Sequence, residues 1–202
     1  MRQNQLAMEE MEKSWEQKLE EQKRGEEEEK QKEREIEEAK MSGNPQVLNL
    51  NEDGMLDRKI FVDLTKHTAA KVGRKKPEGQ DQPEITLGGI GIQSDHATFQ
   101  TAGDRTHLVP HSVEAATHCY VNGVKLTSAD PVELKPNDRV IFGTGTVLLY
   151  RCQGRDSEVE LRDDPTNPIT YEYAMSEKQR LEDAEHEAQQ AEEKARLEAE
   201  NA

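Results

Sequence analysis

The chain has 202 residues, of which 34% are charged and 32% hydrophobic, and its formal net charge is −15. Residues 1–40 carry a net −5, residues 41–154 a net −1 and residues 155–202 a net −9. One balanced globular domain between two acidic ends is therefore expected. Such a chain is a poor prospect for nucleic-acid binding, because phosphate repulsion opposes it.

Targeting and redox signals point to a soluble, cytoplasmic protein. No apolar run approaches the roughly 18–20 residues that a membrane-spanning helix needs, and the Glu-rich start fits neither a signal nor a transit peptide. Cys119 and Cys152 both fall in apolar runs. Buried, reduced thiols are the expectation for them.

Residues 1–40 are predicted to form a charged helix. An apolar stripe at three-to-four spacing runs along its first half, through Leu6, Met8, Met11, Trp15 and Leu19. We expect Met11, Trp15 and Leu19 to dock on another surface or to form a dimer, since an exposed Trp is unusual. The rest of the helix is predicted to be a solvated rod, and residues 41–46 a Gly- and Pro-containing linker.

Residues 47–154 are predicted to form a β-sandwich of many short strands. Apolar segments alternate with Gly, Asp, Asn and Pro clusters at near-regular spacing, with no helical stretch between them. The predicted strands are 47–50, 60–64, 69–72, 85–87, 97–100, 107–109, 119–121, 124–126, 132–134, 139–142 and 146–150. Asn122-Gly123 predicts a two-residue hairpin turn.

The C-terminal end is predicted to be a linker, residues 155–174, followed by an acidic, Ala-rich helix, residues 175–202, with Ser176 as a possible cap. A repeat at three and four residues runs through Leu181, Ala184, Ala188, Ala191 and Ala195. This seam is short and made mainly of alanine. The helix is therefore either weakly paired with another helix or solvated on all sides.

Five short motifs in the middle segment occur in an order and at distances that resemble a forkhead-associated (FHA) domain. They are Gly73-Arg74, Glu84-Ile85-Thr86-Leu87, Gln93-Ser94-Asp95-His96, Tyr120-Val121-Asn122-Gly123 and Leu134-x-x-Asn137-Asp138-Arg139-Val140. The resemblance implies a mainly-β sandwich, here flanked by charged helices with weak coiled-coil character. It also implies that loops at one end of the sandwich hold a phosphothreonine.

The same resemblance implies the site. The candidate phosphopeptide-binding residues are Arg74, Lys75, Gln93, Thr117 and Asn122, and the structural motif residues are Gly73, His96 and Gly123. Gln93 replaces the usual Ser, and Thr117-His118-Cys119 replaces the usual Asn-Gly-Thr. Arg74 is therefore either a phosphate contact or a surface arginine after a turn glycine.

A second resemblance concerns the flanking segments. The run from Met8 to Leu19 resembles the helix that follows the motor in the kinesin-3 family, and Tyr171-Glu172-Tyr173-Ala174 resembles a segment after its FHA domain. No Gly-x-x-x-x-Gly-Lys-Ser/Thr loop occurs. The resemblance implies a stalk-and-FHA region in which the motor is absent.

The expected function is a non-catalytic interaction and regulatory region of a kinesin-3-like motor, which sets dimerisation, autoinhibition or partner binding. The alternatives are a phosphothreonine-peptide adaptor independent of any motor, and part of a longer ATP-driven motor. Partners are expected to be proteins, with microtubules reached only through a motor. No cofactor or metal is expected, because the spacing of His107, His111, His118 and Cys119 fits no standard zinc pattern.

Overall fold

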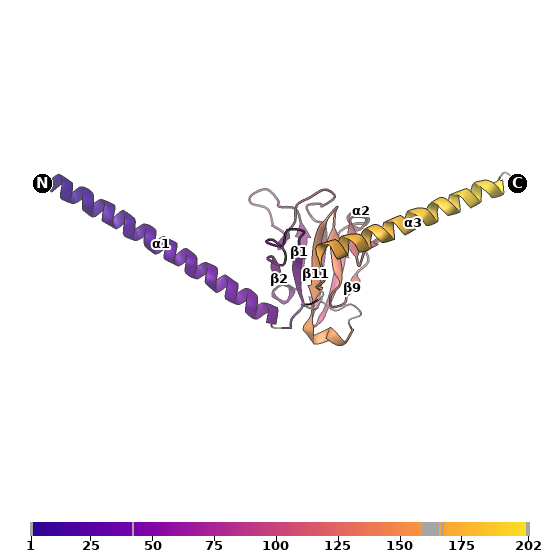
Figure 1. Ribbon diagram of the computed structural model, residues 1–202, viewed down its shortest axis with the longest axis horizontal. Coiled ribbons are helices and arrows are strands. Elements are labelled where there is room, and N and C mark those ends of the chain that lie inside the picture. Colours follow the sequence, from indigo (N-terminus) through magenta and orange to yellow (C-terminus); the bar gives the residue numbers. More distant parts are fainter. Residues whose placement is uncertain (1, 42, 159–165, 167, 201–202) are drawn as a thin grey trace. The chain divides into compact units, whose positions relative to one another are not determined.

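The computed structural model describes residues 2–41, 43–158, 166 and 168–200. It separates into two compact units, Met1–Ser42 and Gly43–Ala202. The described part of the first unit is one helix, α1 (Arg2–Met41), and the second unit holds the strands and the other helices (Figure 1).

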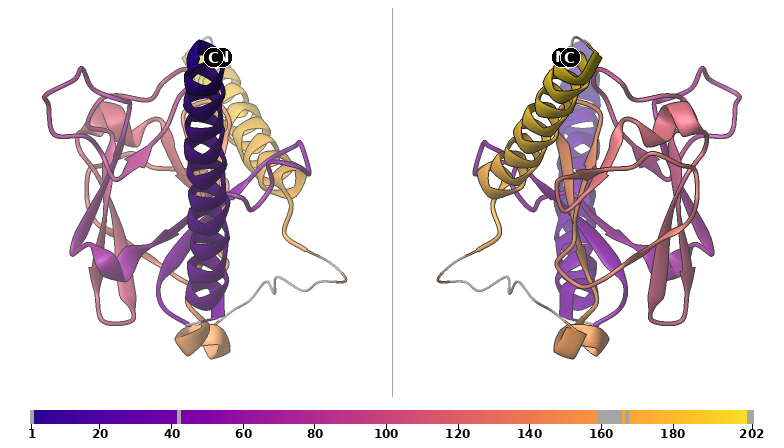
Figure 2. Two further views of the ribbon diagram at one scale, coloured as in Figure 1. Left: turned by 90° about the vertical axis from the view of Figure 1, so that its left-hand side faces the viewer. Right: turned by 90° about the vertical axis from the view of Figure 1, so that its right-hand side faces the viewer.

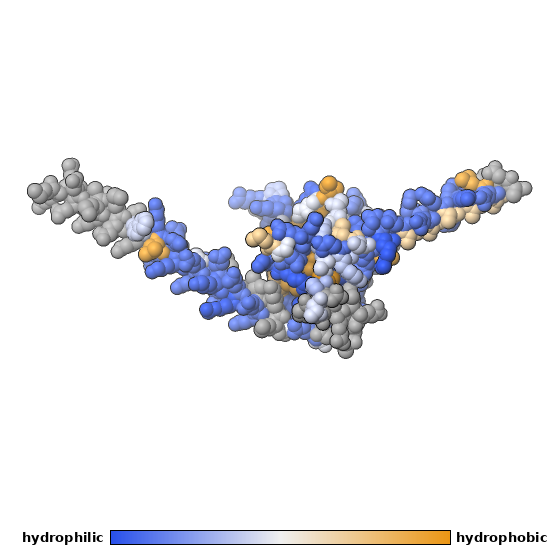
Figure 3. All heavy atoms as spheres, viewed as in Figure 1, coloured by the Kyte–Doolittle hydropathy of each residue, from blue (hydrophilic) through white to orange (hydrophobic). Residues whose placement is uncertain are grey.

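Helix α1 is a charged rod. Its composition of Glu, Lys, Gln and Arg favours helix, and pairs one turn apart add to this, such as Arg24 Nε with Glu28 Oε1 at 3.8 Å. The described part of its surface is mostly hydrophilic (Figure 3). The predicted helix over residues 1–40 corresponds to α1.

The second unit is a sandwich of two sheets, seen as two layers in Figure 2. The six-stranded sheet has the order β2-β1-β11-β10-β7-β8 and the five-stranded sheet the order β4-β3-β5-β6-β9. All neighbours are antiparallel except β3 and β4. The strands are β1 (Gln46–Leu50), β2 (Phe61–Asp63), β3 (Ala69–Gly73), β4 (Ile85–Thr86), β5 (Ala97–Ala102), β6 (Arg105–Pro110), β7 (Cys119–Val121), β8 (Val124–Lys125), β9 (Val132–Leu134), β10 (Arg139–Phe142) and β11 (Thr146–Arg151).

The main core lies between the two sheets. Ala70 and Val72 of β3 are buried and alternate with exposed neighbours, as expected for a strand with one covered face. Phe99 and Phe142 come from opposite sheets and meet edge to face, with ring centroids 6.2 Å apart. Tyr150 Oη and Thr106 Oγ1 are 3.2 Å apart in the same core, so a buried hydroxyl is satisfied.

A second apolar cluster covers the outer face of the six-stranded sheet. Its buried members are Leu50, Tyr120, Ile141, Val147, Leu149, Ile169 and Ala174. The last two come from the start of helix α3 (Tyr171–Glu200) and the residues before it, and Figure 1 shows the start of α3 over β11. Since both faces of β10 are thereby covered, all four of its residues are buried.

Each of the eleven predicted strands corresponds to an observed one, with ends shifted by up to two residues. The prediction that no helix interrupts them was wrong, because α2 (Val113–Ala116) forms one turn, capped by Ser112 Oγ, which accepts from Ala115 N at 3.1 Å. Two 3-10 segments, η1 (Leu64–Lys66) and η2 (Gln153–Glu158), were also not predicted.

Helix α3 begins at Tyr171, four residues before the predicted start. Ser176 therefore lies inside the helix, and Thr170 is the capping residue, with its Oγ1 accepting from Tyr173 N at 3.1 Å. Burial of Ala174 explains the earlier start, because the helix must already be formed where it contacts the sheet. Residues 159–165 and 167 of the predicted linker lie outside the described residues.

Candidate functional site

Most of the candidate phosphopeptide residues gather at one end of the sandwich, which we call the loop end. It consists of Gly73 at the end of β3 with Arg74 and Lys75 after it, residues 88–96 between β4 and β5, and residues 111–118 between β6 and β7. Backbone hydrogen bonds join these segments: Arg74 N donates to Gln93 O at 3.0 Å and His111 N donates to His96 O at 2.9 Å.

Gly73 permits a close backbone approach at the loop end. A Cβ atom there would lie 2.0 Å from the carbonyl oxygen of Ser94. Any other residue would push the 88–96 loop away from β3. The predicted structural role of this glycine therefore has a direct steric basis, and it positions Arg74 beside Gln93.

Arg74 and Lys75 give the loop end its available positive charge. Arg74 is exposed, and its Nη2 donates to the Gly89 carbonyl at 2.8 Å, so that among the described residues its other guanidinium donors have no partner. The exposed Lys75 side chain makes no hydrogen bond or ion pair within the part of the chain that the structure describes. Lys76 is neutralised instead, by Asp95 at 2.6 Å, and this hydrogen bond holds the pKa of the Asp95 carboxyl below its usual value.

Gln93 and Thr117 differ in the hydrogen-bonding groups that remain available to a ligand. The Gln93 side-chain amide makes no hydrogen bond to any described residue, so it is available as a donor. Thr117 Oγ1 donates to the Glu114 carbonyl at 2.7 Å and lies 3.1 Å from His118 Nδ1. The Thr117 hydroxyl proton is thus engaged at the end of α2, and its oxygen remains only as an acceptor.

His96 links the loops from within the core. It is fully buried, and its Nδ1 accepts from Gln93 N at 3.2 Å. Its Nε2 lies 3.5 Å from Cys119 Sγ, which in turn donates to the Ala115 carbonyl at 3.4 Å. Burial lowers the pKa of His96, so the neutral ring that can accept the Gln93 hydrogen bond is favoured.

Asn122 lies at the other end of β7 from this group. Thr117 and His118 precede β7 and Asn122 follows it, a separation of about 13 Å from His118 at roughly 3.3 Å per residue. Its Nδ2 donates to Asp138 Oδ1 at 2.7 Å and its Oδ1 accepts from Arg139 N at 3.0 Å. The structure therefore does not bring Asn122 together with Arg74.

Helix α3 covers this second end, which we call the helix-covered end (Asn122, Gly123, Arg139 and the first turns of α3). Gly123 has a φ of +77°, and a Cβ there would lie 2.9 Å from the backbone of Glu177 and Lys178. Arg139 Nη2 and Nε contact the Glu177 carboxylate at 2.6 and 3.0 Å. These two side chains are only 7% and 13% exposed.

Two aromatic contacts extend this interface, and the sequence alone did not reveal them. The Arg139 guanidinium lies 5.6 Å from the Tyr173 ring centroid, and Lys178 Nζ lies 4.3 Å from that of Tyr120. Arg139 belongs to the last FHA-like motif and Tyr173 to the Tyr171-Glu172-Tyr173-Ala174 segment. Nothing in the sequence indicated that these two motifs are neighbours, and the fold shows that their residues Arg139 and Tyr173 are in contact.

The predicted helix-docking residues lie along α1. Trp15 is 72% exposed and Leu19 is also exposed, and docking or dimerisation through these side chains stays a prediction. Met11 lies on the same helix, but its side chain is outside what the structure describes.

Neither cysteine forms a disulfide, and both are buried. Burial raises the pKa of Cys119 to about 12, so this thiol stays protonated and unreactive. Among the described residues no cluster of three or more His, Cys, Asp or Glu side chains has the geometry for a metal ion. Likewise, none of the described helices combines the length and the apolarity that crossing a bilayer requires.

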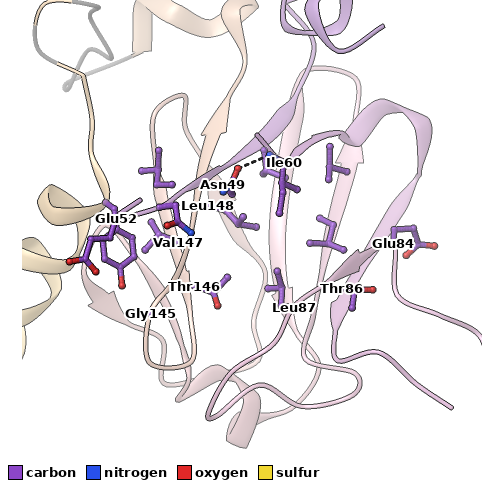
Figure 4. A pocket seen from close by; sticks show the side chains of 16 residues that line it. Asn49, Glu52, Ile60, Glu84, Thr86, Leu87, Gly145, Thr146, Val147 and Leu148 are labelled. Carbon is purple, nitrogen blue, oxygen red and sulfur yellow. Dashed lines mark hydrogen bonds between the residues drawn. The ribbon is translucent and has the colours of Figure 1, made fainter. Parts of the chain in front are cut away.

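A pocket of about 340 Å³ opens between the two sheets, away from the predicted residues (Figure 4). It is lined by Val47, Asn49, Leu50, Asn51, Glu52, Ile60, Val62, Glu84, Ile85, Thr86, Leu87, Gly145, Thr146, Val147, Leu148 and Tyr171. Its lining is drawn from five separate stretches of sequence, two of which overlap the motifs Glu84-Ile85-Thr86-Leu87 and Tyr171-Glu172-Tyr173-Ala174, so neither motif alone predicted a pocket.

Comparison with known proteins agrees with this fold. The profile of the FHA domain matches residues 70–143. Kinesin-like protein unc-104 of Caenorhabditis elegans is 30% identical over 88% of this chain, and human kinesin-like protein KIF14 is 27% identical over the same share. The chain spans only 12% and 11% of the lengths of these two relatives.

Among solved structures, the yeast Dun1 FHA domain in complex with a doubly phosphorylated peptide aligns with 59% of this chain and 81% of its own, at 20% identity and a TM-score of 0.41. Strands β1, β2 and β11 lie outside residues 70–143 but complete the same sandwich. The chain therefore contains an FHA domain, and kinesin-like proteins of the kinesin-3 family are its homologues over most of its length.

Proposed function

We propose that the chain is a non-catalytic protein-interaction and regulatory region of a kinesin-3-like microtubule motor. Its homologues are kinesin-like proteins, and an FHA domain is an interaction module. The observation that carries the proposal is the packing of α3 on the sandwich through a second apolar cluster and the Arg139–Glu177 pair. In this role the protein is cytoplasmic and reaches microtubules through the motor.

The α3 interface has the features of a regulatory contact. One turn of the helix is fixed by the buried Ala174 and the largely buried Glu177 side chain, whereas α3 from Asp183 to Ala199 is exposed. A helix held at one end transmits any movement of its anchor along its length, at 1.5 Å per residue. A partner that displaces the anchor therefore changes the direction of the whole helix.

Motor regulation can be tested by fusing the chain to the motor head of an unc-104-type kinesin and measuring microtubule-stimulated ATPase. Ala174→Glu places a carboxylate in the second apolar cluster, which releases α3 while the core between the sheets stays intact. Ala184→Glu is the matched control, since Ala184 is exposed on the same helix. We expect at least a twofold change in ATPase for the first variant only, and equal rates for both variants contradict the proposal.

Dimerisation is proposed to use the apolar stripe of α1. The exposed Trp15 and Leu19 side chains motivate this, because a large aromatic residue on an isolated helix gains from burial against a second copy. Light scattering of the wild type and of Trp15→Ala tests it. An unchanged molar mass and an unchanged unfolding midpoint would remove the idea.

A second candidate function is phosphothreonine-peptide binding at the loop end. It is favoured by the exposed Arg74 and by Lys75 and the Gln93 amide, which have no partner among the described residues, since a phosphate group is bound best by charge-assisted hydrogen bonds. Asn122 is not included, because its side chain holds Asp138 and Arg139 at the other end of β7. A phosphothreonine peptide library screened with Arg74→Ala, and with Arg105→Ala as control, decides it. Binding that survives Arg74→Ala excludes this function.

A further inference from the structure

Strand β4 is an edge strand with free backbone groups. In its parallel pairing with β3, Leu87 N donates to Gly73 O at 2.9 Å, so the N–H and C=O of the intervening Thr86 point away from β3. Within the described chain, the hydrogen bond of Thr86 outside this ladder is that of its Oγ1 with Pro83 O. The outer edge of β4 can therefore accept another strand.

The 340 Å³ pocket lies beside this edge. Figure 4 shows Thr86 and Leu87 on one side of it and Val147 and Leu148 on the other. Ile60 also lines it and is 60% exposed, although its backbone is held by hydrogen bonds with Asn49. The volume is in the range of known small binding pockets, and its apolar lining fits one or two aliphatic side chains.

The charge of the pocket selects its occupant. Glu52 and Glu84 line it, and none of its sixteen lining residues is Lys, Arg or His. Glu84 already accepts a hydrogen bond from Lys71 N at 2.7 Å, whereas exposed Glu52 has no ion pair with any described residue. A basic side chain is thus favoured here, in contrast to the loop end, where Arg74 and Lys75 favour phosphate.

We propose that β4 and this pocket form a second peptide-binding site, which takes an extended, unphosphorylated segment in which every second side chain faces the pocket. Two of these pocket-facing residues are aliphatic and a third is basic. The segment adds a strand to β4 through the N–H and C=O of Thr86. Its aliphatic side chains enter the pocket and a Lys or Arg pairs with Glu52. Because β4 has only two residues, the affinity is modest, and this site works independently of any phosphate contact at Arg74.

The experiment uses the full chain labelled with ¹⁵N and an acetylated, amidated hexapeptide with Val at positions 1 and 3, Lys at position 5 and Ser at the others, so that the Val and Lys side chains share one face of the strand. Because the chain is acidic, a basic peptide is also attracted to it non-specifically. Two N-methylated peptides separate this attraction from strand addition: one is methylated at the odd-numbered amides and the other at the even-numbered amides, so that only one of them loses the amides that face β4. If the peptide adds a strand to β4, one methylated peptide binds at least tenfold more weakly and the other binds like the unmethylated peptide. The amide chemical shifts that change on binding should be those of residues 49–52, 60 and 84–87. Equal binding by both methylated peptides, or shifts elsewhere, overturns the proposal.

Variants of the protein provide an independent check. Thr86→Pro removes the outward N–H and is tolerated at a strand edge, and Ile60→Ser removes apolar contact at the rim. Val124→Ser is the matched control, because Val124 is 57% exposed on edge strand β8 of the six-stranded sheet. About fivefold weaker binding is expected for Thr86→Pro and for Ile60→Ser, from one lost hydrogen bond or apolar contact. Unchanged binding by both variants, or an equal loss in Val124→Ser or Arg74→Ala, contradicts the proposal.

Discussion

The loop end and the helix-covered end of the sandwich use similar side chains in opposite ways. At the loop end, Arg74 is exposed and holds only a loop carbonyl. At the helix-covered end, Arg139 is buried against Glu177 and Tyr173. The two sites are joined by one strand, β7, so the same short motif set serves a potential ligand at one end and the fold at the other.

An FHA-like motif residue can therefore serve the fold without contacting a ligand. Gly73 and His96 shape the loop end, where groups remain free for a partner. Asn122 and Gly123 shape the turn on which α3 rests. Substitutions at the two ends should therefore affect different measurements.

The largest expected effect is on stability at the helix-covered end. Arg139→Ala leaves the Glu177 carboxylate largely buried without its partner, and loss of one member of such a pair costs about 3 kcal/mol. Urea unfolding followed by circular dichroism measures it. Arg105→Ala is the control, since Arg105 pairs with Glu133 at the surface, and its cost should stay below about 1 kcal/mol. Similar costs for the two variants would mean that α3 does not depend on this pair.

The next effect is on phosphopeptide affinity at the loop end. Arg74→Ala is expected to weaken binding of a phosphothreonine peptide by about tenfold to a hundredfold, because a hydrogen bond to a charged group is lost. Its free energy of unfolding should change little. Asn122→Ala should do the reverse, lowering stability with little change in affinity. Isothermal calorimetry and urea unfolding on both variants measure this, and an affinity loss in Asn122→Ala would erase the distinction between the two ends.

A glycine pair isolates the contact between the turn and α3. Gly123 and Gly103 both have positive φ, but a Cβ at Gly103 meets nothing within 4 Å, whereas one at Gly123 meets the Glu177 backbone at 2.9 Å. Both alanine variants carry the same backbone strain. Gly123→Ala should cost about 1 kcal/mol more, from overpacking against α3. Equal unfolding free energies of Gly123→Ala and Gly103→Ala would show that α3 shifts to accommodate the added methyl group without loss of stability.

A smaller, pH-dependent effect is expected from His96. Burial lowers its pKa in the folded state below the ordinary 6.5, so the unfolded chain binds the proton more readily. The stabilisation is fully present above pH 6.5 and falls as the pH drops toward the folded pKa, by up to about 1.4 kcal/mol per pH unit. Unfolding of wild type and His96→Gln between pH 7.5 and 5.5 measures it. The same slope in both proteins would exclude His96 as the source.

The sequence was sufficient for the sandwich and for part of the site. Alternating apolar segments with turn residues between them predicted the eleven strands. Gly73 at the end of β3 does lie beside the loops that carry Arg74, Gln93 and Thr117. Asn122 was grouped with them because motif order carries no information on which end of a strand a residue occupies. The early start of α3 was missed because Ala174 becomes buried only against a sheet made from distant segments.

We expect the FHA sandwich and the start of α3 to unfold as one unit, and native-state hydrogen exchange measures this coupling residue by residue. Amides from Ala174 to Glu182 should exchange as slowly as those of β10, while amides from Ala184 to Glu198 exchange quickly, because the packing ends between them. Uniformly fast exchange along the whole of α3 would contradict this expectation.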